Sequence, residues 1–113
     1  MIVLVCGGRD YADRKAIQRT LVGSGPLPSL VIHGGALGAD YLAAEVAAEN
    51  GIHCAEVEAL WDHYGKAAGP LRNAAMLRLR PDKVIAFSGG RGTENCVAQA
   101  EEAGIPVERI SDA

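Results

Sequence analysis

Residues 29–40 read SLVIHGGALGAD, a short apolar run that leads through a Gly-Gly pair toward a helix start. Two other stretches repeat this order, IVLVCGGRDY at residues 2–11 and VIAFSGGRGTE at residues 84–94. The apolar residues of each run are consecutive rather than alternating, which is typical of a parallel strand covered on both faces. The three stretches therefore predict buried parallel strands, each followed by a glycine-rich turn into a helix.

The remaining chain completes an alternating pattern. Residues 52–57 and 105–110 predict two further strands, beside strands at 2–5, 30–32 and 84–87. Between them we expect helices at residues 13–22, 41–50, 71–79 and 94–103. This order predicts an α/β, Rossmann-like three-layer fold, with a mostly parallel five-stranded sheet and helices on both faces.

Residues with capping chemistry mark the expected helix starts. Asp40 and Thr93 are expected N-caps, and Pro70 suits the first turn of the third helix. The helix at 41–50 is apolar nearly all round apart from Glu45 and Glu49. That pattern fits either a helix shared between the sheet and its neighbours or a homodimer interface of small residues.

Composition limits the class of protein. The 113 residues predict one domain, 1–113, and 49% hydrophobic with 22% charged residues excludes a disordered chain. Three separated cysteines exclude a disulfide scaffold, and a net charge of −3 argues against broad binding to nucleic acid. With no membrane-length apolar run and no basic leader, we expect a cytoplasmic bacterial or phage protein without a membrane partner.

The glycine-rich turns predict the ligand site. Ligands of open α/β sheets bind at the carboxyl ends of the strands, where backbone N–H groups and helix N-termini favour phosphate. Glycines that only make tight turns are the alternative for any single pair, but three pairs at one edge favour a common site. The candidate ligand-binding residues of these turns are Gly7, Gly8, Arg9, Asp10, His33, Gly34, Gly35, Ala36, Asp40, Gly89, Gly90, Arg91, Gly92, Thr93 and Glu94.

A long connection at residues 58–69 supplies further candidates. It holds Trp61, Tyr64 and Lys66, and Arg72 and Asn73 follow in the first turn of the next helix. Arginine suits bidentate contact with phosphate, and an aromatic ring suits stacking on a base. We expect this connection to fold over the ligand as a lid. Rings that merely cover a small sheet, and solvated arginines, are the alternatives.

Several common motifs are missing. The sequence has no GxGxxG dinucleotide fingerprint, no GxxxxGK[ST] phosphate loop and no GxSxG elbow. His33, His53 and His63 lack ligand spacing, so we predict neither a metal nor a cofactor.

Four motifs in order resemble a known family. GGRDY at 7–11, HGGALGAD at 33–40, the segment from Trp61 to Met76 with its YGK, AGP and RN elements, and AFSGGRGT at 86–93 are similar to the YspA-like (YAcAr) branch of the SLOG superfamily. That superfamily includes the LOG-type phosphoribohydrolases and DprA. The resemblance covers nearly the whole chain and implies a Rossmann-like fold that binds a nucleotide or nucleotide-derived ligand.

The resemblance also implies a candidate catalytic pair. In LOG-type enzymes an arginine and a glutamate, within PGGxGTxxE, act on an N-glycosidic bond. Arg72 matches the arginine, whereas Ser88 replaces the proline and Cys96 stands at the glutamate position. Glu94 is the nearest carboxylate, at a different angle on the helix. Two functions follow: nucleotide binding, as a sensor or processing module, or hydrolysis of nucleoside 5′-monophosphates with Arg72 and Glu94 as catalytic candidates. Single-stranded DNA binding is disfavoured by the acidic pI of 5.5.

Overall fold

A computed structural model describes residues 1–23 and 25–111. Five strands form one sheet: β1 (Ile2–Cys6), β2 (Leu30–His33), β3 (His53–Glu56), β4 (Lys83–Ala86) and β5 (Val107–Arg109). Their order across the sheet is β3-β2-β1-β4-β5, and every neighbouring pair is parallel. The chain therefore builds outward from β1 in one direction and then returns to its other side, which places the topological switch point between β1 and β4.

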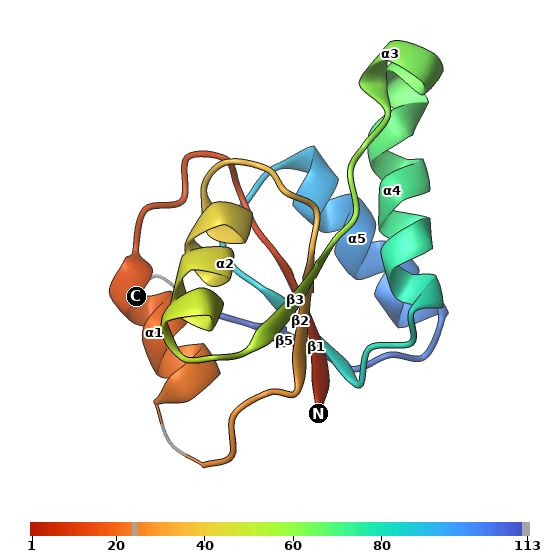
Figure 1. The fold of residues 1–113 in the computed structure, drawn as a ribbon. Coiled ribbons are helices and arrows are strands. Elements are labelled where there is room, and N and C mark those ends of the chain that lie inside the picture. The colour runs from red at the N-terminus through yellow and green to blue at the C-terminus, as the bar shows by residue number, and fades with distance from the viewer. Residues whose placement is uncertain (24, 112–113) are drawn as a thin grey trace.

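Helices cover both faces of this sheet. They are α1 (Arg14–Val22), α2 (Ala39–Glu49), α3 (Trp61–Tyr64), the short 3₁₀ helix η1 (Gly65–Ala67), α4 (Ala68–Arg78) and α5 (Arg91–Glu102). Figure 1 views the sheet near its edge, with α1 and α2 on one side and α4 and α5 on the other. The predicted Rossmann-like three-layer architecture is confirmed.

The sheet separates two hydrophobic clusters. Val3 and Val5 point toward α1 and α2, whereas Leu4 and Cys6 point toward α4 and α5, as the alternation along a strand requires. Phe87 and Ile17 belong to the first cluster and are fully buried or nearly so. The central strand β1 is therefore buried on both sides, which explains its unbroken apolar sequence.

The structure explains the apolar surface of α2. Ala43, Val46 and Ala47 are completely buried, because α2 packs on β1, β2 and β3 and against α1. This packing explains the apolar pattern as that of a helix shared between the sheet and its neighbours. The homodimer stays an untested prediction.

Two predicted helix starts are wrong. The N-cap of α2 is Gly38 rather than Asp40, and α5 starts at Arg91 after Gly90 rather than after Thr93. Both helices begin in glycine-rich sequence with low intrinsic helix propensity, so tertiary packing decides their first turns. In addition, α4 starts at Ala68, which places Pro70 at its third residue.

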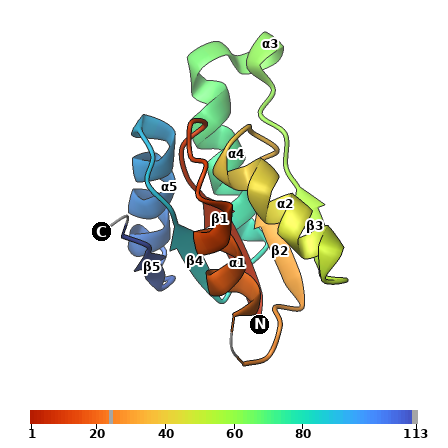
Figure 2. The same cartoon turned by 90° about the vertical axis from the view of Figure 1, so that its left-hand side faces the viewer.

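The long connection is more ordered than the sequence indicated. Residues 61–67 form α3 and η1, which lead directly into α4. Figure 2 shows this helical segment rising beyond the carboxyl edge of the sheet. The connection is thus a helical arm on α4, and its role as a lid stays a prediction.

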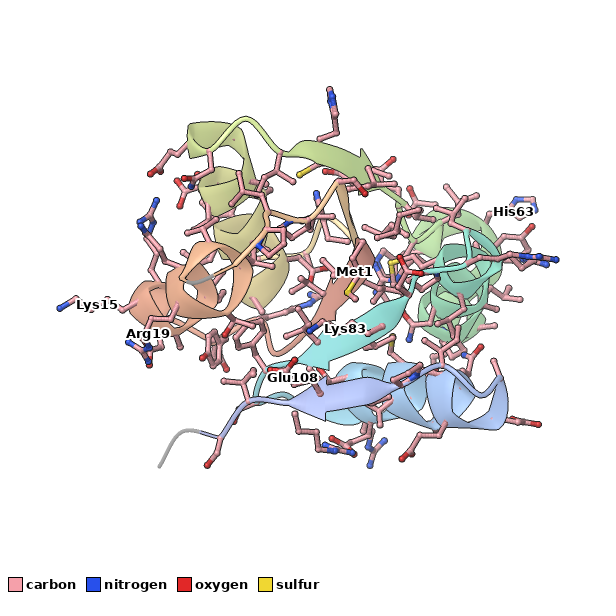
Figure 3. The ribbon with its side chains drawn as sticks, turned by 90° about the horizontal axis from the view of Figure 1, so that it is seen from below. Met1, Lys15, Arg19, His63, Lys83 and Glu108 are labelled. Carbon is pink, nitrogen blue, oxygen red and sulfur yellow. The ribbon has the colours of Figure 1, made fainter. Side chains whose placement is uncertain are left out.

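The opposite edge of the sheet is closed by polar contacts. Figure 3 looks at this amino edge, where Lys83 and Glu108 lie together on neighbouring strands. Lys83 Nζ donates to Glu108 Oε1 at 2.9 Å. At the same edge the Ile2 N–H donates to Asp82 Oδ2 at 2.6 Å. Within the described ranges, no helix is long and apolar enough to cross a membrane.

The buried centre of β1 gives a stability prediction. Leu4 is 0% exposed, so Leu4→Ala should lower the free energy of unfolding by about 2–5 kcal/mol through lost burial and a residual cavity. Leu71→Ala, at a residue 45% exposed on α4, should change it by less than about 0.5 kcal/mol. Urea unfolding followed by circular dichroism measures both, and equal losses would contradict the assigned core.

Candidate ligand-binding site

A cavity of about 590 Å³ lies at the carboxyl edge of the sheet, beside the switch point. Buried residues from the strands and α4 form its floor, namely Val5, Cys6 and Met76. All three glycine-rich turns contribute to its walls, as do the segment after β3 and the first turn of α4. Its other lining residues are Gly7, Gly8, Arg9, Gly34, Gly35, Ala36, Leu37, Asp40, Glu58, Ala59, Trp61, Gly69, Arg72, Gly90, Gly92 and Thr93.

The turn after β1 lies between the turn after β4 and the start of α2, and it bonds to both. The Gly8 N–H donates to Ser88 O at 2.8 Å, and Gly8 O accepts from the Ala39 N–H at 3.2 Å. A Cβ at Gly7 would lie 2.5 Å from Ala39 Cβ, closer than side chains can pack. Because the Gly8 amide is already bonded, this turn supports the cavity wall more than it offers donors to an anion.

The turn after β2 is held by a buried carboxylate. Asp40 is 6% exposed, and its Oδ2 accepts from the Gly34 N–H at 2.9 Å and the Ala36 N–H at 3.4 Å. The Gly35 N–H donates to His33 Nδ1 at 3.0 Å. The three amides of this turn are thus satisfied within the protein. Gly34, Gly35 and Ala36 line the cavity as candidates for ligand contact, but their amides are already bonded to Asp40 and His33.

Burial raises the pKa of the Asp40 carboxyl above its ordinary value of 3.8. The hydrogen bonds from Gly34 and Ala36, and the nearby His33 and Arg72, act in the opposite direction without cancelling that effect. A carboxylate in this setting destabilises the folded state when it is charged, unless a further donor reaches it.

Arg72 links the turn after β2 to α4. Its Nη1 donates to Gly34 O at 2.9 Å, and its Nε donates to Asn73 Oδ1 at 3.0 Å. A Cβ at Gly34 would lie 2.1 Å from Arg72 Nη1, so only glycine lets the guanidinium lie there. Nη2 makes no hydrogen bond within the described part of the chain, which leaves its two donors for a molecule in the cavity.

Asn73 connects Arg72 to the first turn of α5. It is 3% exposed, and its Nδ2 donates to Gly92 O at 3.2 Å and Asn95 Oδ1 at 3.1 Å. Asn95 Oδ1 also accepts from Gln99 Nε2 at 2.7 Å. Asn73 therefore positions the guanidinium and the helix start relative to each other, and it does not line the cavity itself.

The N-terminus of α5 lies at the cavity without a side-chain cap. Gly90 is its N-cap with no side-chain capping bond, and the first intrahelical bond runs from the Glu94 N–H to Gly90 O at 3.0 Å. The N–H groups of residues 91–93 precede that bond, as at any helix start. A Cβ at Gly90 or Gly92 would meet nothing within 4 Å, so space is free in front of this turn.

Aromatic and acidic side chains stand at the exposed rim. The guanidinium carbon of Arg9 lies 6.0 Å from the Trp61 ring centroid, which is within the range of a cation–π contact. Trp61 is 48% exposed and also packs against Gly69, whose Cβ would lie 3.3 Å from the ring. Glu58, at the end of the segment after β3, adds a carboxylate to the same rim.

Cys6 in the floor of the cavity pairs with Cys96 beneath it. Both are buried, and the Cys6 thiol donates to the sulfur of Cys96; this bond and burial raise the Cys6 pKa far above its ordinary value. Cys6 is therefore a neutral thiol and lacks the thiolate character that a nucleophile needs. Cys96, at the position of the LOG-type glutamate, packs inside the core with 1% exposure.

Several predicted ligand residues lie outside the cavity. His33 is buried beneath its turn, and Asn73 acts behind Arg72. Tyr64 and Lys66 lie on α3 and η1 without lining the cavity, and Arg91 is exposed on the first turn of α5. Asp10 and Gly89 line a neighbouring hollow of about 530 Å³ that shares Gly8, Arg9 and Gly90 with the main cavity.

Glu94 faces away from Arg72. Both of its carboxylate oxygens accept from Arg109, at 2.9 and 3.0 Å, and this pairing lowers the pKa of Glu94. It lines a separate hollow with Arg109 and Ile110. The geometry therefore separates the predicted catalytic pair of Arg72 and Glu94, because the two residues face different hollows.

Sequence reasoning missed Glu58 as a cavity residue. It follows β3 at the same edge as the glycine-rich turns, so the rule that strand ends carry the site could have found it. The segment after β3 has no Gly-Gly pair, so a search for glycine-rich turns did not identify it. Among the residues that the structure describes, no three His, Cys, Asp or Glu side chains gather as a metal site.

Fold and cavity together define a Rossmann-like α/β domain with a cavity at its topological switch point. The model of the YspA, cpYpsA-related SLOG family (YAcAr) matches residues 1–64, which include the first two glycine-rich turns. The chain therefore belongs to this family.

Two individual proteins are also similar to this chain. The Gene 61 protein of Mycobacterium phage D29 is 38% identical over 120 residues, which span 97% of this chain and 96% of that protein. The X-ray structure of DNA processing protein A (DprA) from Streptococcus pneumoniae matches with a TM-score of 0.81 and 23% identity. That match covers 98% of this chain and 50% of the DprA chain, so this chain spans half the length of that protein and shares its fold.

The raised pKa of Asp40 predicts how stability changes with pH. Above pH 3.8, and up to the native pKa, the folded state binds more protons than the unfolded state, so the free energy of unfolding should fall as pH rises. Asp40→Asn keeps an acceptor for Gly34 and should remove this fall.

Urea unfolding at a series of pH values between 4 and 7 measures the effect, with Asp62→Asn as the control at an exposed residue of α3. As pH rises, the free energy of unfolding of Asp40→Asn should increase relative to that of the unsubstituted protein. A relative gain by the unsubstituted protein over the same range would disprove the assigned environment.

Proposed function

We propose that the protein binds a nucleotide or nucleotide-derived metabolite in the cavity at the carboxyl edge of its sheet. One observation carries the proposal: the cavity brings the uncapped N-terminus of α5 together with the free Nη2 of Arg72. Both offer donors and positive potential, which favour a phosphate group. The SLOG family assignment is compatible with nucleotide-related binding or processing.

The cavity has room and chemistry for the rest of such a ligand. A volume of about 590 Å³ is within the range of small-molecule sites. Trp61 offers a ring face at the rim for a base, and Arg9 lies over that ring. The phosphate at α5 and the base at Trp61 would thus occupy different parts of one cavity.

We propose a small molecule rather than a nucleic acid as the partner. The chain carries a net charge of −3, and two carboxylates, Asp40 and Glu58, line the cavity. A polyphosphate backbone would meet repulsion there, without the basic stripe that nucleic-acid grooves provide. DprA is named a DNA processing protein, but the likeness of this chain to it is one of fold.

Hydrolysis of an N-glycosidic bond has weaker support. The carboxylate that the LOG-type resemblance offers for this reaction is Glu94, and Glu94 is ion-paired with Arg109 outside the cavity. We therefore expect no free base after incubation with AMP, GMP, CMP or UMP, as measured by chromatography. Release of base at an enzymatic rate would replace binding with catalysis as the main function.

The anion end of the cavity gives the direct test of binding. Isothermal titration calorimetry with AMP, GMP, CMP, UMP and ADP-ribose should find saturable binding for at least one of them. Gly90→Val places a side chain in front of the α5 N-terminus, where a Cβ meets no protein atom within 4 Å, so binding should be lost in a folded protein. Arg72→Ala should weaken binding by about 1.5–3 kcal/mol through loss of a charge-assisted bond.

Arg78→Ala is the matched control for Arg72, because Arg78 is exposed at the end of the same helix. It should leave affinity unchanged, and circular dichroism should show each variant folded. Unchanged affinity in both Gly90→Val and Arg72→Ala would remove the proposed site, as would an absence of binding across the panel.

A further inference from the structure

Asp40 combines burial with an open acceptor. The residue is 94% shielded from solvent, and Oδ2 takes both hydrogen bonds from the turn after β2. Oδ1 takes no hydrogen bond from any residue in the described part of the chain, yet it is not one of the fully enclosed atoms. Asp40 lines the cavity, so the cavity is where Oδ1 is accessible.

A charged oxygen at this depth requires a donor. Burying an ionised carboxylate is costly unless its oxygens are hydrogen-bonded, and only one oxygen of Asp40 is satisfied by the protein. The group that a ligand places over Oδ1 is therefore a donor such as a hydroxyl or an amino group. The ionised carboxylate disfavours a phosphate oxygen at this position, since two anions at contact distance repel.

The positions of the other cavity residues indicate which donor lies over Oδ1. Arg9 and Trp61, the partners suited to a base, are exposed at the rim, whereas Asp40 lies at the buried floor beside Val5 and Cys6. The phosphate has its donors on α5 and Arg72. In a nucleotide, the group between the base and the phosphate is the sugar, and its donors are the ribose hydroxyls.

We propose that Asp40 Oδ1 accepts a hydrogen bond from a ribose hydroxyl, so that the site selects ribonucleotides over their deoxy counterparts. This inference rests on the proposed function and adds the sugar to it. Asp40 acts here as a specificity-determining residue. One oxygen of the Asp40 carboxylate holds the turn after β2, and the other binds the ligand.

The first experiment varies the ligand and leaves the protein intact. The tightest binder among AMP, GMP, CMP and UMP is compared by calorimetry with its 2′-deoxy and 3′-deoxy forms. Loss of a hydrogen bond to a charged group predicts that at least one deoxy form binds roughly ten- to a hundredfold more weakly. Equal affinities for all three ligands would overturn the inference while leaving the proposed function in place.

The second experiment changes the protein and keeps the ligands the same. Asp40→Asn should reduce the ribose preference to within about threefold, because an amide no longer offers a charged acceptor. Asp62→Asn, at an exposed residue of α3 that does not line the cavity, should keep the full preference. A full preference that survives in Asp40→Asn would contradict the assignment to Asp40.

Two further outcomes are distinguishable. If affinity falls when a carbonyl replaces the amino group of the base, as from AMP to IMP, and is insensitive to the sugar, then Asp40 binds the base and the inference fails. If none of the ribonucleotides binds, the proposed function itself fails. The ligand series needs no variant, so it decides the question even if Asp40→Asn does not fold.

Discussion

The buried carboxylate of Asp40 is the contact on which the arrangement of the cavity depends. Its Oδ2 holds the amides of Gly34 and Ala36, and the carbonyl of the same Gly34 accepts from Arg72. Arg72 in turn bonds Asn73, which bonds Gly92 at the start of α5. One chain of hydrogen bonds therefore runs from α2 through the turn after β2 and α4 to the helix start that faces the cavity. Loss of the first link would free the others, because each is fixed by its neighbour.

This network divides the three glycine-rich turns by role. Gly7 and Gly34 are needed because Ala39 and Arg72 lie where a Cβ would be. Gly90 and Gly92 have open space in front of them, so they alone leave room for a ligand at a helix N-terminus. The glycines of these turns thus have two physical causes in one protein: close packing within the protein at the first two turns and at Gly89, and an open approach at Gly90 and Gly92.

Much of the fold could be predicted from sequence, whereas only part of the site could. Unbroken apolar runs such as that of β1 identified the strands, since a strand buried on both faces must be apolar throughout. The start of α5 was misplaced because glycines 90 and 92 oppose a helix locally and packing overrides them. The cavity at the carboxyl edge of the sheet brings together Arg9, Arg72 of α4 and the third turn, whose role in ligand binding stays a prediction. The role of Glu94 depended on Arg109, 15 residues further along the chain, and no local pattern shows such a pair. Asp40 bonds amides only 6 and 4 residues before it, but the sequence indicated a helix N-cap at this position and not a carboxylate that holds the preceding turn.

The central claim is that an anionic group of the ligand lies at the N-terminus of α5 beside Arg72. The most direct test is to titrate the ¹⁵N-labelled protein with the nucleotide that binds most tightly and to record the amide chemical shifts at each step. The account predicts the largest shifts at residues 90–93, with smaller ones at Gly34 and Ala36, whose amides stay bonded to Asp40. Shifts concentrated on residues 34–36, or on the amino edge of the sheet, with residues 90–93 unaffected, would contradict it.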